Sequence, residues 1–356
     1  MRRGAEREIH DTGVRIAARG HQVHLVTSTP RGVTRAGRFG GMSVRYLRLP
    51  LPATLARRGV SDVAAFAAAS LPAIVASRAD LVHAWHYGDA WAAVRAKRVR
   101  RRPVVLKLTG TVEPDRLAHV RIDRRLFREA IAGADEVWCN SAYAREVMLP
   151  FDVAMHVVPA GVDLALFRPT APRADPPIVL CASSPDEPRK RLVDVFDAWP
   201  WVSEAVPGAR LVLAGRASGA TRTSLLARLP PSLVSTVSWV GDIADESLVA
   251  AYSSASVVVA PAPHEALGLT TIEALACGTP VAGARSGATT DLVGGGVGAL
   301  FEPGDPVGCA AAILAALLLA GEPVTAGACR AAALPFDWPG IVDVVERRWK
   351  DLVAGF

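Results

Sequence analysis

The sequence predicts an α/β protein with two doubly wound, Rossmann-like domains that face each other across a cleft. Short runs rich in β-branched residues alternate with helical segments along the chain, which is the pattern of parallel sheets covered by helices. The runs are apolar almost throughout, as expected of strands buried on both faces. A proline-rich passage at residues 159–177 cannot continue a helix and divides the alternation into two halves.

The first half begins with a helix over residues 5–18, which ends at Arg19-Gly20 and leads into a strand over residues 21–27. Further strands are predicted there at residues 81–85, 103–108, 136–140 and 155–159. After the linker, strands are predicted at residues 178–182, 209–215, 237–241, 257–261 and 279–282. An amphipathic helix over residues 336–353 carries Trp338 and Trp349. The predicted domains are therefore residues 1–170 and 171–335, with residues 336–356 as a helix that crosses back to the first domain.

Composition excludes several classes of protein. Apolar residues make up 51% of the 356 residues and charged residues 21%, which excludes a disordered chain. The longest apolar stretch, residues 309–320, is shorter than the roughly 20 residues of a membrane span. The charged N-terminus lacks the apolar region of a secretory signal. Five cysteines without CxxC spacing indicate a reducing cytosol and argue against a disulfide framework or a structural zinc site.

Charge is distributed unevenly along the chain. Residues 1–170 carry 27 Lys and Arg against 15 Asp and Glu, whereas the remainder carries 13 against 19. A basic half indicates an anionic partner, such as nucleic acid, a phosphorylated substrate or a membrane surface. The alternative explanation of the total positive charge is arginine-rich codon usage that reflects the base composition of the genome. This alternative does not explain why the charge is concentrated in the first half.

The segment with the most chemical content is residues 261–280, where a strand runs into a loop and then a helix. Gly268 has no side chain, so the backbone amides of the helix start, at Leu269 and Thr270, can approach a phosphate closely. Glu265 precedes them, where a carboxylate can accept hydrogen bonds from sugar hydroxyls, and Glu273 can hold a ribose diol in bidentate fashion. The alternative is that Glu273 is a solvated helix residue and that Glu265 only complements the helix N-terminus.

This segment resembles the E-x7-E signature of retaining glycosyltransferases of family 4 (glycosyl transferases group 1), which have the two-domain GT-B fold. Other segments resemble motifs of the same family. They are residues 4–7 (GAER), 19–23 (RGHQV), 158–163 (VPAGVD), 167–169 (FRP), 186–190 (DEPRK), 209–215 (ARLVLAG), 298–305 (GALFEPGD) and 336–338 (FDW). The resemblance covers nearly the whole chain and is densest over the second half.

The resemblance implies that the second domain binds a nucleotide-diphosphate-sugar donor and the first an acceptor. Lys190, helped by Arg189, is implied to neutralise the donor diphosphate, and Glu265 to act at the sugar. Without the resemblance, the alternative is that these cations form a solvated basic run on the surface. The other implied donor-binding residues are Glu273, Gly268, Leu269, Thr270, His264, Ser184 and Gly215, and those of the acceptor side and first loop are Gly4 and Thr109. Family members work without a bound metal and the chain has no D-x-D triplet, so no metal or other cofactor is expected.

Four departures from the family pattern are visible. Thr109 stands where the family has a His near the reacting carbon, and Ser184 stands where an Arg partners the diphosphate-binding Lys. Arg3 stands at the first glycine of the loop motif, and the chain starts only two residues earlier. We therefore expect the family's first strand, central in its sheet, to be missing, either from a start site set too late or from a real truncation.

The function implied is transfer of a sugar, with retention at the anomeric carbon, to a hydroxyl of a glycolipid, polysaccharide or small glycoside. A sugar-nucleotide epimerase of the same fold is one alternative. A degenerate, non-catalytic binding or regulatory subunit is another, favoured by Thr109, Ser184 and the missing strand. No GxGxxG follows a predicted strand, which argues against a dinucleotide dehydrogenase, and nucleic acid is not expected as a partner.

A basic helix in the first half indicates a membrane-facing surface. Residues 95–102 (RAKRVRRR) hold six basic groups, and Arg121, Arg124, Arg125 and Arg128 recur at helical spacing, away from Ile122, Leu126 and Ile131. Such a basic amphipathic helix can dock on anionic lipid. A solvated face or an anionic sugar-phosphate acceptor explains the same charges. We expect a cytoplasmic protein, peripheral on the inner face of the cell membrane.

Overall fold

The computed structural model describes residues 4–29, 35–49, 54, 61–112, 117 and 120–356. They form two compact units, a C-terminal unit, Ala160–Gly340, and an N-terminal unit that joins the residues before 160 to Ile341–Phe356. The sequence placed the boundaries at residues 170 and 335, whereas the units meet after residues 159 and 340. Met1 and Arg3 lie outside the described residues, and the expectation of a missing first strand stays a prediction.

A six-stranded sheet forms the centre of the C-terminal unit, in the order β10-β9-β8-β11-β12-β13. Its strands are β8 (Ile178–Ala182), β9 (Arg210–Ala214), β10 (Val237–Gly241), β11 (Val257–Ala260), β12 (Val281–Ala284) and β13 (Gly298–Phe301). Every neighbouring pair is parallel, so the predicted α/β class is confirmed. The chain order reverses between β8 and β11, and open sheets of this kind bind ligands beyond the carboxyl ends of the strands at such a point.

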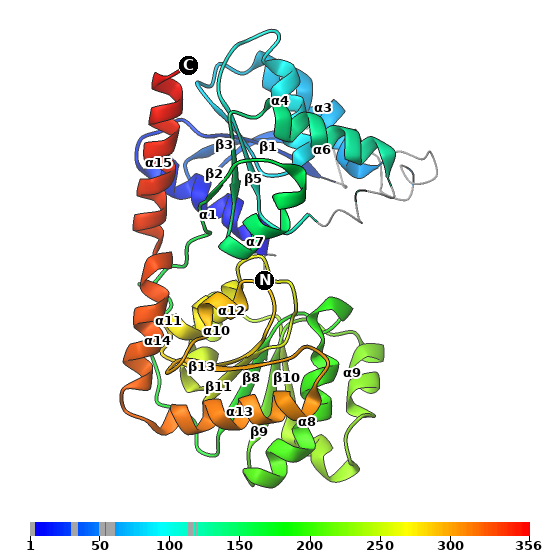
Figure 1. Cartoon of the computed structure of the whole chain (residues 1–356), viewed down its shortest axis with the longest axis vertical. Coiled ribbons are helices and arrows are strands. Elements are labelled where there is room, and N and C mark those ends of the chain that lie inside the picture. The colour runs from blue at the N-terminus through cyan, green and yellow to red at the C-terminus, as the bar shows by residue number, and fades with distance from the viewer. Residues whose placement is uncertain (1–3, 30–34, 50–53, 55–60, 113–116, 118–119) are drawn as a thin grey trace. The chain divides into compact units, whose positions relative to one another are not determined.

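Helices cover both faces of this sheet (Figure 1). Its helices are α8 (Leu192–Ala205), α9 (Gly219–Leu226), α10 (Asp245–Ser254), α11 (Leu269–Ala276), α12 (Thr289–Leu292), α13 (Pro306–Gly321) and α14 (Thr325–Ala333). Val179 and Cys181 of β8 face the core beneath α8, α9 and α13, whereas Leu180 and Ala182 face the core beneath α10, α11 and α14. Alternate residues thus enter two cores, which is why the strands are apolar throughout.

The N-terminal unit holds two sheets within the described residues, where the sequence predicted one parallel sheet. A parallel sheet has the order β4-β5-β6-β7, and a smaller sheet has the order β1-β3-β2. The strands are β1 (His24–Thr29), β2 (Arg35–Phe39), β3 (Met42–Arg48), β4 (Val82–Ala84), β5 (Val104–Leu108), β6 (Glu136–Cys139) and β7 (Met155–Val157). The antiparallel pair β2–β3 corrects the prediction. Its turn, Gly40-Gly41 with φ of 54° and 79°, is a hairpin signal that was overlooked.

Helices of the N-terminal unit bury both small and large apolar residues. They are α1 (Gly4–Ala18), α3 (Asp62–Ala76), α4 (Tyr87–Ala96), α6 (Arg121–Gly133), α7 (Ala142–Val147) and most of α15 (Trp338–Ala354). Ala90, Ala93 and Ala96 of α4 are buried. On α15, Glu346 accepts hydrogen bonds from Arg19 at 2.8 Å and His21 at 2.9 Å, so charged contacts tie this helix to the chain after α1.

None of the helices in the described part of the chain is by itself long and apolar enough to cross a membrane. One pair, α13 followed by Thr325–Phe336, meets the criteria of length and composition when taken together, but it is bent by 108°.

Candidate functional site

The predicted donor-site residues of the C-terminal unit lie in loops that follow the carboxyl ends of parallel strands. Ser184 and Lys190 follow β8, Gly215 follows β9, and Glu265 and Gly268 follow β11. Because the strands are parallel, these loops share one edge of the sheet. Strand order alone therefore gathers residues that lie as far as 84 positions apart in the sequence.

A charged contact at this edge joins a basic turn to Glu265. Arg189 and Lys190 belong to a single 3₁₀ turn, Pro188–Lys190. The Nζ atom of Lys190 lies 2.6 Å from Oε1 of Glu265, and Nη1 of Arg189 lies 3.2 Å from the same oxygen. Arg189 also pairs with Glu187 at 2.9 Å. The sequence assigned the cations to a diphosphate and Glu265 to a sugar, whereas in the structure they are paired with each other.

The loop that carries Glu265 is fixed by the loop after β12. The backbone N–H of Ala288 donates to the carbonyl of Glu265 at 2.9 Å, and that of His264 donates to Oγ of Ser286 at 3.1 Å. Gly287 lies so close that a Cβ atom there would be 2.6 Å from the backbone nitrogen of Glu265. His264 itself has a positive φ of 57°, a conformation that costs energy outside glycine. Ser286 and Gly287 were not identified from the sequence, since they contact this loop only through the fold.

Gly268 begins α11 in the left-handed conformation, with a φ of 83°. Among the described residues no side chain caps this helix start, so its first N–H groups remain available to an anion. Thr270 donates from Oγ1 to the carbonyl of Ala182 at 3.3 Å, which ties the helix start to the end of β8. Leu269 packs against the core beneath α11. The helix start thus has the backbone arrangement on which the predicted anion site depends, and anion binding there stays a prediction.

Ser184 and Gly215 lie at neighbouring strand ends. Oγ of Ser184 donates to the carbonyl of Arg216 at 3.5 Å. Gly215 has a φ of 146°, and a Cβ atom there would lie 2.2 Å from the carbonyl oxygen of Ser183. Only glycine fits this close backbone approach. Ser184 supplies no cation where the family pattern has Arg, so in the described residues the positive charge near Glu265 comes from Arg189 and Lys190.

Glu273 lies one turn into α11 as predicted, but it is buried. Its Oε2 atom accepts a hydrogen bond of 3.0 Å from the hydroxyl of Tyr252, and 5% of the residue is exposed. Burial, together with the charge of Glu273, raises the pKa of Tyr252 well above its ordinary value, so the hydroxyl stays a donor. The Tyr252 contact was not foreseen from the sequence, because the two residues come from different helices.

Asp186, the first residue of the DEPRK segment, has a structural contact. Its carboxylate accepts from the Thr221 hydroxyl at 2.6 Å and from the Ser218 backbone N–H at 2.9 Å, at the start of α9. These hydrogen bonds lower the pKa of the Asp186 carboxyl, with that from Thr221 the largest cause. Asp186 therefore holds the loop after β8 to the start of α9.

Gly4 and Thr109 belong to the N-terminal unit. Gly4 is exposed at the start of α1. Thr109 follows β5, and its carbonyl accepts from Nδ2 of Asn140 at 3.1 Å. Nδ2 of Asn140 also reaches Oε2 of Glu8 at 3.1 Å, and Glu8 forms a buried ion pair with Lys107. No sequence pattern signals this pair, since two charged residues 99 positions apart are brought together only by packing.

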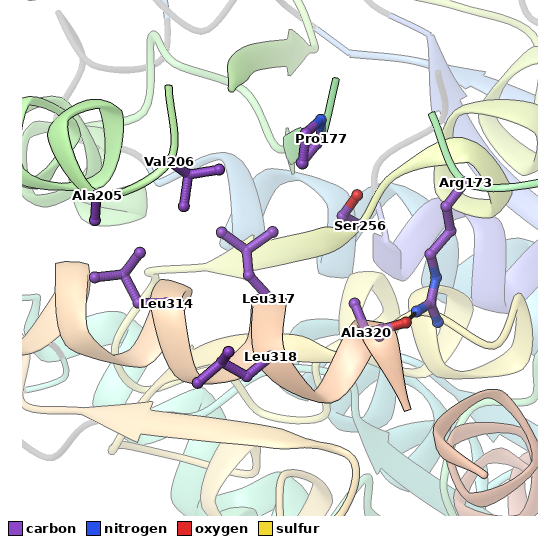
Figure 2. A pocket seen from close by; sticks show the side chains of 10 residues that line it. Arg173, Pro177, Ala205, Val206, Ser256, Leu314, Leu317, Leu318 and Ala320 are labelled. Carbon is purple, nitrogen blue, oxygen red and sulfur yellow. Dashed lines mark hydrogen bonds between the residues drawn. The ribbon is translucent and has the colours of Figure 1, made fainter. Parts of the chain in front are cut away.

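An apolar groove of the C-terminal unit lies away from Lys190, Glu265 and Gly268 (Figure 2). It has a volume of about 560 Å³ and is bounded by Pro177 and Ser256, which precede β8 and β11, and by the end of α13. Figure 2 shows Leu314 and Leu317 rising from α13 toward Val206. The groove therefore sits at the amino ends of the strands, opposite to the charged loops. Within the described residues no group of three or more His, Cys, Asp or Glu is arranged to hold a metal ion.

Models of known protein families match both halves of the chain. A family model described as Glycosyltransferase Family 4 matches residues 2–166, and one described as Glycosyl transferases group 1 matches residues 176–318. The chain belongs to this family. The resemblance drawn from the E-x7-E segment and the loop motifs is therefore confirmed at the level of the family and of the GT-B fold.

Two curated relatives are similar to this chain in sequence. The chain is 32% identical over 224 residues to the MMP alpha-(1->4)-mannosyltransferase of Mycolicibacterium hassiacum, which covers 61% of this chain and 51% of the relative. It is 32% identical over 209 residues to a GDP-mannose-dependent alpha-(1-6)-phosphatidylinositol dimannoside mannosyltransferase of Mycobacterium tuberculosis, covering 55% and 52%. The matches thus span about half the length of these relatives.

Solved structures match over nearly the whole chain. Sucrose-phosphate synthase from Thermosynechococcus elongatus superposes with a TM-score of 0.82 at 23% identity, covering 99% of this chain and 94% of that one. Anabaena HepE in complex with UDP-glucose superposes with a TM-score of 0.75 at 20% identity, covering 100% and 97%. At these identities the likeness establishes the fold.

Proposed function

We propose that the protein transfers a sugar from a nucleotide-diphosphate-sugar donor to an acceptor hydroxyl, with retention at the anomeric carbon. The observation that carries the proposal is the contact of Lys190 and Arg189 with Glu265 beside the uncapped start of α11. Two cations and free backbone N–H groups suit a diphosphate leaving group. A carboxylate at the same point suits a sugar that gains positive charge in the transition state.

In this proposal the C-terminal unit binds the donor and the N-terminal unit the acceptor. Lys190, Arg189 and the start of α11 supply the positive charge that a metal ion provides in other transferases, so the reaction proceeds without a metal. Glu273 binds the ribose diol of the nucleotide. The printed names of relatives and neighbours include GDP-mannose and UDP-glucose, which makes a hexose on GDP or UDP the donor to test first.

The experiment is a nucleotide-release assay with a panel of UDP- and GDP-hexoses, in the presence of candidate sugar, polyol and lipid-linked acceptors. Release that depends on both donor and acceptor is the expected result, with NMR of the product reporting the anomeric configuration. Lys190→Ala should abolish nearly all release, whereas Lys350→Ala, on the exposed face of α15, should not change it. EDTA should leave activity intact. Inactivation by EDTA that magnesium or manganese reverses contradicts the metal-free proposal, and absence of release with every donor contradicts the transfer proposal.

We also propose that α6 docks on an anionic membrane at the cytoplasmic face. Arg121, Arg124, Arg125 and Arg128 are all exposed, on a helix whose opposite side buries Leu126 and Phe127. Val120 and Ile122 are also exposed, at 39% and 42%, and add apolar contact at the helix start.

The basic run at residues 95–102 contributes less than the sequence suggested. Arg95 pairs with Glu129, Lys97 pairs with Asp135 at 2.6 Å, and Arg102 is buried against backbone carbonyls. These three cations are engaged within the fold, whereas Arg98, Arg100 and Arg101 are exposed. We assign the docking surface to α6 because its four exposed arginines lie on one side of a single helix, although Arg125 also pairs with Glu129 at 2.9 Å.

Co-sedimentation with neutral and anionic vesicles at low and high salt tests the docking surface. Binding to anionic vesicles that salt weakens is expected, since each cation near an anionic leaflet contributes about 1 kcal/mol. Replacing the four α6 arginines with Gln should abolish binding, and replacing them with Lys should keep it. Equal binding of the Gln and Lys variants contradicts this role of α6.

A further inference from the structure

A buried carboxylate on α8 contacts both the basic turn and a loop after another strand. Asp194 is 2% exposed. Its Oδ1 and Oδ2 atoms accept from Nη2 and Nε of Arg191, each at 2.7 Å. Oδ2 also accepts from the backbone N–H of Gly304 at 3.0 Å. Both oxygens are thus engaged in charge-assisted hydrogen bonds with defined geometry.

Arg191 has an unusual backbone for its residue type. It has a φ of 48° and a ψ of 40°, in the left-handed region, where a residue with a side chain is strained. It directly follows Lys190 and joins the 3₁₀ turn to α8. The bidentate contact with Asp194 supplies a compensating interaction. Because Arg191 directly follows Lys190, its backbone conformation also determines how the turn positions Lys190.

Asp194 therefore connects two loops at the carboxyl edge of the sheet directly, and a third through Lys190. Through Arg191 it holds the turn after β8, and through Gly304 it holds the loop after β13. Lys190, in the held turn, in turn reaches Glu265 after β11. Gly304 has no side chain, and a Cβ atom there would lie 3.1 Å from Nη2 of Arg191. The close approach of the two loops depends on this glycine.

We infer that Asp194 is a positioning residue, which fixes the turn that presents Lys190 and Arg189 to the donor diphosphate. This inference rests on the proposed function. Asp194 touches no substrate, since it is buried below the turn. A purely structural reading is that Asp194 only stabilises the first turn of α8, as acidic residues do near helix N-termini. The two readings differ in what happens when the strained residue and its partner are removed together.

The test compares Asp194→Asn, Arg191→Gly and the double variant with the wild type. Arg191→Gly leaves the buried Asp194 without its charged partner, and Asp194→Asn removes the carboxylate that holds the partly exposed Arg191, so both should lower the melting temperature. The double variant removes both charges and places glycine at the left-handed position, so it should recover stability. Affinity for UDP or GDP, measured by calorimetry, should fall about tenfold in all three variants, because the turn is no longer fixed to the loop of Gly304.

A matched control and a second measurement complete the design. Asp197→Asn removes a bidentate pair with Arg228 elsewhere on α8 and should leave nucleotide affinity unchanged. Amide hydrogen exchange at Gly304 should rise in Asp194→Asn, with or without nucleotide, because its acceptor is weakened. Recovery of wild-type affinity together with stability in the double variant overturns the inference, as does wild-type affinity in Asp194→Asn. A wild-type protein that binds neither nucleotide contradicts the proposed function itself.

Discussion

Replacing Glu265 by Gln removes one negative charge while keeping the shape of the side chain, and we expect UDP or GDP to bind the variant more tightly. Oε1 of Glu265 lies 2.6 Å from Nζ of Lys190 and 3.2 Å from Nη1 of Arg189. A diphosphate that contacts the same cations must replace this carboxylate. In the variant the cations have no carboxylate to release, so the cost of exchange disappears.

The magnitude follows from the exposure of the pair. The side chains of Lys190 and Glu265 are 19% and 23% exposed, between a surface pair and a buried one. Water screens part of the attraction, so we assign about 1 kcal/mol to the pair, which corresponds to roughly fivefold tighter binding. Turnover should change in the opposite direction by about 100-fold, because a neutral amide does not stabilise positive charge that develops on the sugar.

Calorimetric titration of UDP or GDP at two salt concentrations measures the first effect, and the nucleotide-release assay measures the second. The fivefold difference should shrink at high salt. Glu302→Gln is the matched control, since Glu302 forms an exposed pair with Arg285 at 3.0 Å and loses the same charge. Unchanged or weaker nucleotide binding by Glu265→Gln refutes the reasoning. An equal gain of affinity in Glu302→Gln also refutes it, because the gain then comes from the lower negative charge of the whole unit and not from the ion pair.

Further outcomes follow from other contacts. Gly287→Ala should lower turnover at least tenfold and also lower the melting temperature, since Gly287 has a φ of 66° and a Cβ atom there would lie 2.6 Å from the backbone of Glu265; unchanged kinetics contradict this. Glu273→Ala should weaken donor binding about 10- to 100-fold and lower stability, whereas Glu273→Gln should keep stability through the bond to Tyr252; equal melting temperatures of the two variants contradict it. His83 has buried ring nitrogens and a pKa that burial holds well below its usual value. Stability should therefore fall as pH drops below about 6.5, where the unfolded state takes up a proton. His83→Phe should flatten this dependence in melting curves from pH 7.5 to 5.5, and an unchanged slope contradicts the assignment.

Much of the fold could be predicted because its signal is local. The strands Ile178–Ala182 and Val237–Gly241 occur where predicted, since buried parallel strands are short apolar runs that end at turns. The hairpin β2–β3 was missed because arginines interrupt its apolar alternation. Its register, with Phe39 opposite Met42, depends on a glycine pair that was not read as a turn.

The site could be predicted only in part, because local motifs identify residues but not their partners. Gly268 lies at a helix start and Lys190 in a turn after a strand, as their motifs predict. The contacts of Asp194 with Gly304 and of Glu273 with Tyr252 connect different segments. Such contacts arise from tertiary packing, which a single sequence does not encode at fixed spacing.

The pairing of Lys190 with Glu265 links the two halves of the proposed donor. The motifs predict a separate ligand for each charge, the diphosphate for Lys190 and the sugar for Glu265. In the structure the two charges satisfy each other, so a donor that separates them has to satisfy both. A free sugar that binds Glu265 breaks the ion pair and leaves Lys190 without a negative partner. A nucleoside diphosphate alone binds Lys190 and leaves Glu265 without a partner. An intact nucleotide sugar compensates both charges, so the pair favours the complete donor over its fragments.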